Sequence, residues 1–148
     1  MRLLRFLRAE TESYGILTAS GEVLDLIQLS KALKHLVAPS LDKLVPSGMK
    51  GLNTIERLLR GSTESEKKKA TINVKDVRIL APIASPPKII CLGLNYRDHA
   101  AEQNASLPEE PIIFIKPHTA IIGPEEPIVK PVFVKELDYE AEFSCDYW

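Results

Sequence analysis

Two glutamates near the end of the chain, Glu140 and Glu142, have the type and spacing that point most directly to chemistry. They lie in residues 137–143, LDYEAEF, where apolar side chains occupy the alternate positions. Alternate side chains of a β-strand point to the same face, so both carboxylates share one face, with roughly 7 Å between their Cα atoms. Like charges on one face repel unless water or a cation lies between them. The pair indicates either a solvated strand face or a site for a hard divalent cation.

A histidine and a glutamate three positions apart, His99 and Glu102, form a second candidate. They lie in residues 96–103, a short stretch that the sequence predicts to be helical, after the apolar strand-like residues 88–92. Residues three apart are neighbours on a helix. A carboxylate beside an imidazole fixes the tautomer of the ring and supports its cationic form, as a general base that takes a proton from water requires. The alternative is an ordinary ion pair on a surface helix.

A lysine directly before a proline, Lys116, ends the apolar residues 112–115. The proline holds the backbone of the preceding residue extended. The ammonium group is then well placed to meet an anionic group of a substrate, although most lysines are simply solvated. His118, close by, is expected to be structural rather than catalytic.

The elements that must position these residues divide the chain in two. Residues 1–60 predict a small α+β domain, and the polar residues 61–70, GSTESEKKKA, are interpreted as a surface linker because they lack apolar periodicity. In residues 71–148, frequent prolines between positions 82 and 131 exclude long helices, and short β-branched segments lie between them. The predicted fold class is α+β, mainly β, with the candidate residues in the second part.

Composition argues against several classes of partner and location. The 19 basic and 20 acidic residues give a formal net charge of −1, which does not favour a phosphate backbone or an anionic membrane. No segment approaches the ~20 apolar residues of a membrane helix, and arginines interrupt the N-terminal apolar residues, so no signal-peptide core is present. Two cysteines without paired spacing favour a reducing compartment. We therefore expect a cytoplasmic protein that binds neither nucleic acid nor membrane.

Taken together and in order, these segments resemble the fumarylacetoacetate hydrolase family. Three segments look like successive hallmarks of that family: KIICLGLNYRDHAAEQ, EPIIFIKPHTAIIGPEEPI and LDYEAEF. The opening MRLLRF, YGIL and GEVLDL is similar to the small N-terminal region of many members. The resemblance implies a mixed β-roll catalytic domain, of which residues 71–148 form an incomplete start, and a divalent cation that is Mg²⁺ or Mn²⁺, or in some members Ca²⁺.

The resemblance also implies roles for the candidate residues. The first two acidic metal ligands of the family fall on Glu140 and Glu142, and a further acidic ligand comes from downstream. The water-activating pair, carried on a mobile lid, falls on His99 and Glu102, and Lys116 matches a lysine-proline position near the pocket, where it would bind substrate. The family implies a homodimer that hydrolyses or decarboxylates small oxo-acids and 1,3-dicarbonyl compounds, of fumarylacetoacetate or acylpyruvate type. An isomerase or hydratase of the same fold is the alternative.

The chain departs from the family pattern after the paired glutamates, where the family continues with an apolar strand ending in glycine. This sequence reads FSCDYW over residues 143–148. These residues can be encoded TTT AGC TGT GAT TAT TGG, and removal of one T gives codons for L-A-V-I-I-G. We therefore expect a frameshifted, truncated member whose product is unstable and inactive, because it lacks an acidic ligand and further strands. The alternative is a non-enzymatic fragment, either a pseudogene product or a small binding module formed by residues 1–60.

Overall fold

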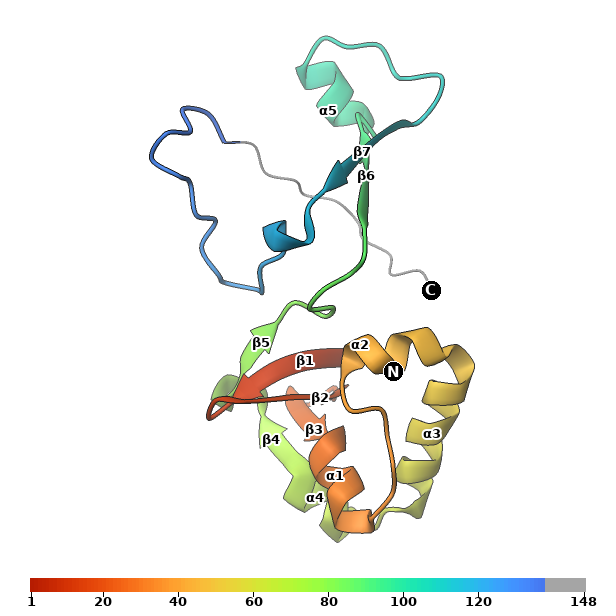
Figure 1. Ribbon diagram of the computed structural model, residues 1–148. Coiled ribbons are helices and arrows are strands. Elements are labelled where there is room, and N and C mark those ends of the chain that lie inside the picture. Colours follow the sequence, from red (N-terminus) through yellow and green to blue (C-terminus); the bar gives the residue numbers. More distant parts are fainter. Residues whose placement is uncertain (138–148) are drawn as a thin grey trace. The chain divides into compact units, whose positions relative to one another are not determined.

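The computed structural model describes residues 1–137 as two compact units, and each is considered by itself (Figure 1). Among the described residues, the first unit contains Met1–Ala84 together with residues 122–137, and the second is Ser85–Ile121. Both contain helices and antiparallel strands, so the predicted fold class, α+β and mainly β, is confirmed. None of the helices in residues 1–137 combines the length and the apolar character that a membrane span requires.

A five-stranded antiparallel sheet forms the centre of the first unit. In sheet order its strands are β4 (Thr71–Asn73), β3 (Glu22–Asp25), β2 (Thr11–Leu17), β1 (Leu3–Arg8) and β5 (Arg78–Leu80). The turn between β1 and β2 consists of Ala9 and Glu10, both with positive φ, 43° and 64°. Two such residues are what a tight two-residue hairpin turn requires, because its twist then matches that of the strands.

Helices cover one face of this sheet, and each face has its own apolar core (Figure 1). The helices of the first unit are α1 (Leu26–Leu33), α2 (Leu41–Leu44), α3 (Gly48–Gly61) and α4 (Glu64–Ala70). Leu26 and Leu29 of α1 pack with Ile55 of α3 and with Tyr14 of β2. On the other face the core contains Leu4, Phe6, Val23 and Ile72. Strand β1 supplies Leu4 and Phe6 because alternate residues of a strand share a face.

The structure differs from the predicted linker over residues 61–70, most of which form helix α4. Thr63 and Glu66 make a reciprocal capping box: the Glu66 backbone N–H donates to Thr63 Oγ1 (3.3 Å), and the Thr63 N–H donates to Glu66 Oε2 (2.8 Å). Acidic residues occupy the first turn and lysines the last, as the helix dipole favours. Apolar periodicity could not reveal this helix, because it buries only Ala70.

The two strands that follow α4 belong to the sheet of the first unit, whereas the sequence predicted them in the catalytic domain. Residues 71–148 were expected to belong to one catalytic domain, but β4 pairs with β3, and β5 pairs with β1. Arg5 strengthens the second pairing, because its Nη1 donates to the carbonyl of Ala81 at 2.8 Å. Residues 71–80 therefore complete the sheet of the first unit, and assignment of the remaining residues to a catalytic domain stays a prediction.

The second unit is a hairpin that carries one short helix between its strands. Strands β6 (Ile89–Gly93) and β7 (Ile112–Lys116) form a two-stranded antiparallel sheet, and α5 (Arg97–Glu102) lies between them in the chain. The predicted strands and the predicted short helix are confirmed here. Ala100 is the one buried hydrophobic residue within Ser85–Ile121. The second unit therefore has almost no apolar core of its own.

Candidate functional site

Helix α5 places His99 and Glu102 side by side on the second unit. His99 Nδ1 lies 4.0 Å from Glu102 Oε2, which is within reach of an ion pair but too long for a hydrogen bond. Their side chains are 52% and 79% exposed. The predicted neighbours are thus brought together, as an open pair in contact with solvent. Their catalytic role stays a prediction.

Gln103 makes the shorter contact with the imidazole ring, and the sequence pattern had not pointed to it. Its Nε2 lies 3.2 Å from His99 Nε2. An amide nitrogen only donates, so the ring Nε2 accepts, and the proton of the neutral ring lies on Nδ1, which faces Glu102. Gln103 follows His99 by four positions, a spacing that makes residues neighbours on a helix, and this was the signal that could have found it.

Lys116 ends strand β7, opposite Ile89 in the register of the sheet. Its Nζ lies 5.7 Å from the centroid of the Phe114 ring, so the ammonium group interacts with the ring face. Phe114 lies two residues earlier in the strand and therefore on the same face. The structure thus gives Lys116 a defined position on the hairpin, while its contact with a substrate stays a prediction.

The predicted metal ligands, Glu140 and Glu142, lie outside the described residues 1–137. Within those residues, no group of three or more His, Cys, Asp or Glu side chains is placed to hold a metal ion. A single imidazole and one carboxylate, as in His99 and Glu102, are a poor ligand set for a hard cation, which prefers several oxygen ligands. The fit of a divalent cation to this chain therefore depends on Glu140 and Glu142, and their role as ligands stays a prediction.

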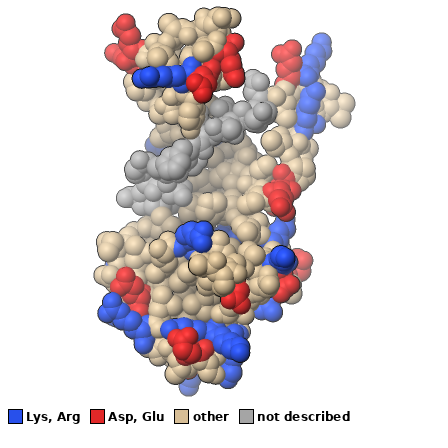
Figure 2. Space-filling model, turned by 180° about the vertical axis from the view of Figure 1, so that it is seen from behind, with Lys and Arg blue, Asp and Glu red and all other residues tan. Residues whose placement is uncertain are grey.

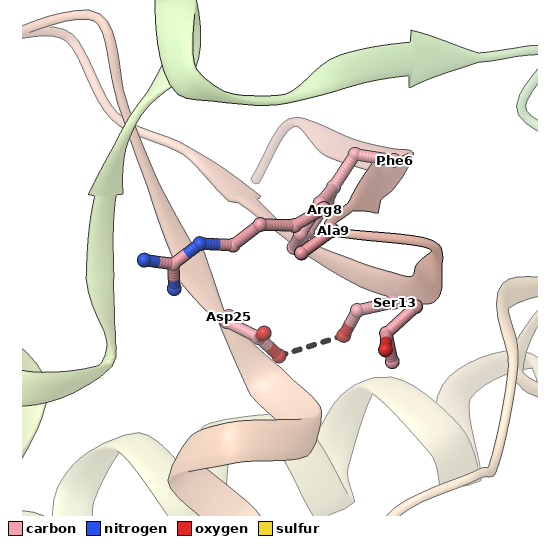
Figure 3. A pocket seen from close by; sticks show the side chains of 6 residues that line it. Phe6, Arg8, Ala9, Ser13 and Asp25 are labelled. Atoms are coloured by element: carbon pink, nitrogen blue, oxygen red, sulfur yellow. Dashed lines mark hydrogen bonds between the residues drawn. The ribbon is translucent and has the colours of Figure 1, made fainter.

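The first unit contains an open hollow of about 400 Å³ beside the turn between β1 and β2 (Figure 3). Its lining includes Phe6, Arg8, Ala9, Thr11, Ser13 and Asp25. Asp25 Oδ1 accepts hydrogen bonds from Ser13 Oγ (2.7 Å) and from the Gln28 backbone N–H (2.9 Å), which makes it the cap of helix α1. The carboxylate is thus engaged in holding the fold, and the lining contains no histidine that could activate Ser13.

Charged side chains of both signs are interspersed over the face displayed in Figure 2. The first unit also holds ion pairs between charged side chains, including Lys67 with Glu64 (2.9 Å) and Arg78 with Glu126 (2.9 Å). Exposed pairs of this kind contribute little to stability. Nothing in this charge distribution tests the expectation that the chain binds neither nucleic acid nor membrane, which stays a prediction.

Comparisons with known proteins connect the chain, and most directly residues 88–145, to a family. Residues 88–145 match the family described as "Fumarylacetoacetate (FAA) hydrolase C-terminal". Over 147 residues the chain is 35% identical to the mitochondrial oxaloacetate tautomerase fahd2 of Xenopus laevis, and the match covers 97% of this chain and 43% of that protein. The matched segment contains His99, Glu102 and Lys116.

Two crystal structures resemble the chain in three dimensions. One is a protein from Mycobacterium smegmatis described as HpcE (TM-score 0.60, 26% identity, 88% of this chain and 41% of that one). The other is maleylpyruvate hydrolase from Sphingobium sp. SYK-6 in complex with manganese(II) and pyruvate (TM-score 0.59, 25% identity, 89% and 43%). The chain spans less than half the length of each of these three relatives. Since sequence and structure agree with the resemblance, the chain belongs to the fumarylacetoacetate hydrolase family.

Proposed function

We propose that this chain carries part of a divalent-metal-dependent enzyme that hydrolyses or isomerises small oxo-acids of the acylpyruvate type. The observation that carries the proposal is the side-by-side placement of His99 and Glu102 on α5, inside the segment that matches the family. The names of two relatives support it, since one is an oxaloacetate tautomerase and the other a maleylpyruvate hydrolase.

In this proposal His99 is the group that moves a proton. Glu102 faces Nδ1 and stabilises the positive charge that the ring gains, and Nε2 takes the proton from water or from a substrate carbon. Because Gln103 occupies the lone pair of Nε2 in the structure, its amide must turn away before the ring can act as a base. Lys116 would bind an anionic group of the substrate.

A bound divalent cation, held by Glu140 and Glu142, would supply positive charge where negative charge develops on the substrate. The manganese(II) in the Sphingobium hydrolase supports a divalent cation in this family. We propose Mg²⁺ or Mn²⁺, with Ca²⁺ as a further candidate. A hydrolase needs the attacking water that His99 would activate, whereas an isomerase or decarboxylase needs only the proton transfer or the charge stabilisation.

The test uses the gene with one T removed from the codon for Phe143, beside the gene as it stands. We expect the restored-frame product to convert an acylpyruvate or to interconvert the keto and enol forms of oxaloacetate when Mn²⁺ or Mg²⁺ is added. Replacement His99→Asn should then lower the turnover by a factor on the order of 10²–10⁴, as loss of a general base does. Absence of turnover with every oxo-acid and metal tried would contradict the proposal.

The frameshift over residues 143–148 and the inactivity of the 148-residue chain also stay predictions. The nucleotide sequence over a few hundred bases past the codon for Trp148 tests the frameshift. Family-like sequence in a shifted frame would support it, and its absence would favour the alternative of a non-enzymatic fragment. Expression of the 148-residue chain tests the second prediction, and a soluble, cooperatively melting, metal-dependent hydrolase would contradict it. A homodimer and a cytoplasmic location stay predictions as well, to be tested by sedimentation and by imaging of the tagged protein.

A further inference from the structure

The hollow beside the turn between β1 and β2 collects charged and hydroxyl side chains from three strands on one face of the sheet (Figure 3). Phe6 and Arg8 are two positions apart in β1, and the register sets them opposite Ser13 and Thr11 of β2. Directly opposed residues of an antiparallel pair share a face. Asp25 of β3 pairs with β2 two positions beyond Ser13 and therefore joins the same face. The sheet topology thus brings together side chains that are separated in the sequence.

One part of this lining accepts hydrogen bonds. Asp25 is only 8% exposed, and both hydrogen bonds that it accepts within residues 1–137 fall on Oδ1, from Ser13 Oγ (2.7 Å) and from the Gln28 N–H (2.9 Å). The other oxygen, Oδ2, has no donor in that part of the chain. Ser13 gives its single hydroxyl proton to Asp25, so its oxygen keeps only acceptor sites. Because a buried carboxylate oxygen without a donor is unfavourable, this part of the hollow favours a ligand with positively charged N–H groups.

The guanidinium group of Arg8 gives the same hollow the opposite property. It has five N–H donors and no acceptor, in a fork that matches the two oxygens of a carboxylate. Figure 3 shows the Arg8 side chain extending along the hollow that Asp25 also lines. Among the described residues, no ion pair joins Arg8 to Asp25 or to another acidic side chain. The two charges therefore line one hollow without neutralising each other directly.

We propose that this hollow binds a free amino acid, whose carboxylate pairs with Arg8 and whose ammonium group donates to Asp25 and Ser13. A simple anion would lie beside the Asp25 carboxylate, and a simple cation would lie beside the Arg8 guanidinium, so each would meet a like charge. Phe6 and Ala9 are the apolar part of the lining and favour an aliphatic side chain on the ligand. The volume of about 400 Å³ lies near the lower end of the range for ligand clefts, roughly 300–1,000 Å³.

This site lies in the first unit and is separate from the proposed reaction, because it uses neither His99 nor Glu102. Its ligand class follows from the charges and hydrogen-bonding groups of the hollow alone. Failure of the oxo-acid activity would therefore leave it standing, and its own failure would leave the proposed activity standing.

The test titrates the ¹⁵N-labelled 148-residue chain with L-leucine at millimolar concentration and follows the backbone amides by NMR. We expect saturable shifts confined to β1, β2, β3 and the first turn of α1. Two analogues of leucine each keep one charge: 4-methylpentanoate lacks the ammonium group, and isoamylamine lacks the carboxylate. Each should bind about 10-fold more weakly or worse, as loss of a charge-assisted hydrogen bond does. Leucine should also raise the urea midpoint of the first unit, because it binds the folded state.

Two replacements test the two ends of the site. Arg8→Gln removes the fork, and Asp25→Asn removes the acceptor oxygen Oδ2 while an asparagine oxygen can still cap α1. Each should weaken leucine binding by about 10-fold or more. The matched control is Arg60→Gln, which makes the same change of charge on α3, where the side chain is 83% exposed. It should leave the affinity unchanged. Preserved amide dispersion of the first unit shows that each variant folds.

Four results would each overturn the proposal. Leucine could produce no saturable shift, or one of the two analogues could bind as tightly as leucine. Arg8→Gln could bind leucine with unchanged affinity, or Arg60→Gln could lose as much affinity as Arg8→Gln, which would show a general effect of charge.

Discussion

The two units of this chain are built from similar residues and differ in how they bury them. In the first unit, helices and a five-stranded sheet enclose two apolar cores, and Ile55 is 0% exposed. In the second unit, a two-stranded sheet leaves Ile113 65% exposed. The candidate residues His99, Glu102 and Lys116 all lie on the second unit. Stability of this chain is thus concentrated in one region, and these three candidate residues lie in the other.

The largest expected effect comes from truncating the same residue type in both units. Ile55→Ala opens a cavity in the first core and should lower the free energy of unfolding by about 2–5 kcal/mol. Ile113→Ala removes atoms that are largely in water and should change it by less than about 0.5 kcal/mol. Urea unfolding monitored by circular dichroism measures both. Equal losses would mean that the second unit has a core comparable with the first.

Glycine replacements probe the same difference through backbone packing. A Cβ at Gly15 in β2 would overlap the carbonyl oxygen of Leu24 in the neighbouring strand, which cannot move without breaking the sheet. We expect Gly15→Ala to lower the free energy of unfolding by about 1–3 kcal/mol. At Gly93 in β6, the new atom meets Ile112 Cγ2 at 3.2 Å, and that side chain can shift. Gly93→Ala should leave the urea midpoint unchanged, and a loss as large as that of Gly15→Ala would contradict this account.

Tyr14 gives the first core a dependence on alkaline pH. Its phenol donates a hydrogen bond to the Ala38 carbonyl at 2.8 Å, and burial, followed by the charge of Asp25, raises its pKa from 10.0 to about 12. A raised folded-state pKa means that the stabilisation is complete below pH 10.0 and is lost as the pH rises through about 12. Urea midpoints measured across this range should fall.

The replacement Tyr14→Phe should remove that alkaline dependence and cost about 0.5–1.5 kcal/mol at neutral pH through the lost hydrogen bond. Tyr96→Phe, in the second unit, is the control and should leave the unfolding of the first unit unchanged. An alkaline fall that persists in Tyr14→Phe would show that another group causes it.

The smallest effect is expected at helix α4, on the surface of the first unit. Thr63→Ala removes the capping box and should lower the free energy of unfolding by about 1 kcal/mol. The control Thr54→Ala lies in the exposed interior of α3, where Thr54 Oγ1 donates to the Lys50 carbonyl and caps nothing. It should show no loss in the same urea measurement.

Glu66 adds an acid dependence to the same cap. Hydrogen bonds from the Thr63 backbone N–H, and then from its hydroxyl, lower the pKa of Glu66 below 4.5. The stabilisation of α4 by the Glu66 carboxylate is therefore present above pH 4.5 and is lost as the pH falls through the lowered pKa of Glu66. Glu66→Gln should remove this acid dependence of α4, as followed by amide exchange. An unchanged dependence would contradict the role of the cap.

The parts of the fold that could be predicted are those set by local spacing. Strands β6 and β7 follow from short β-branched segments between prolines, and the neighbour relation of His99 and Glu102 follows from a spacing of three on a helix. Helix α4 was missed because its cap and charge order, rather than an apolar stripe, stabilise it. The pairing of β5 with β1 joins residues more than 70 positions apart, and no local pattern records it. Gln103 was missed although its spacing of four from His99 makes the two residues neighbours on a helix.

Amide hydrogen exchange of the 148-residue chain, resolved by residue, tests the difference between the two units most directly. A backbone amide exchanges when the structure around it opens locally, and the free energy of that opening is larger where the segment is more buried and better hydrogen-bonded. The structure predicts strong protection in β1, β2 and α3 and rapid exchange in β6 and β7. Equal protection in both units, or rapid exchange throughout the first, would contradict the account.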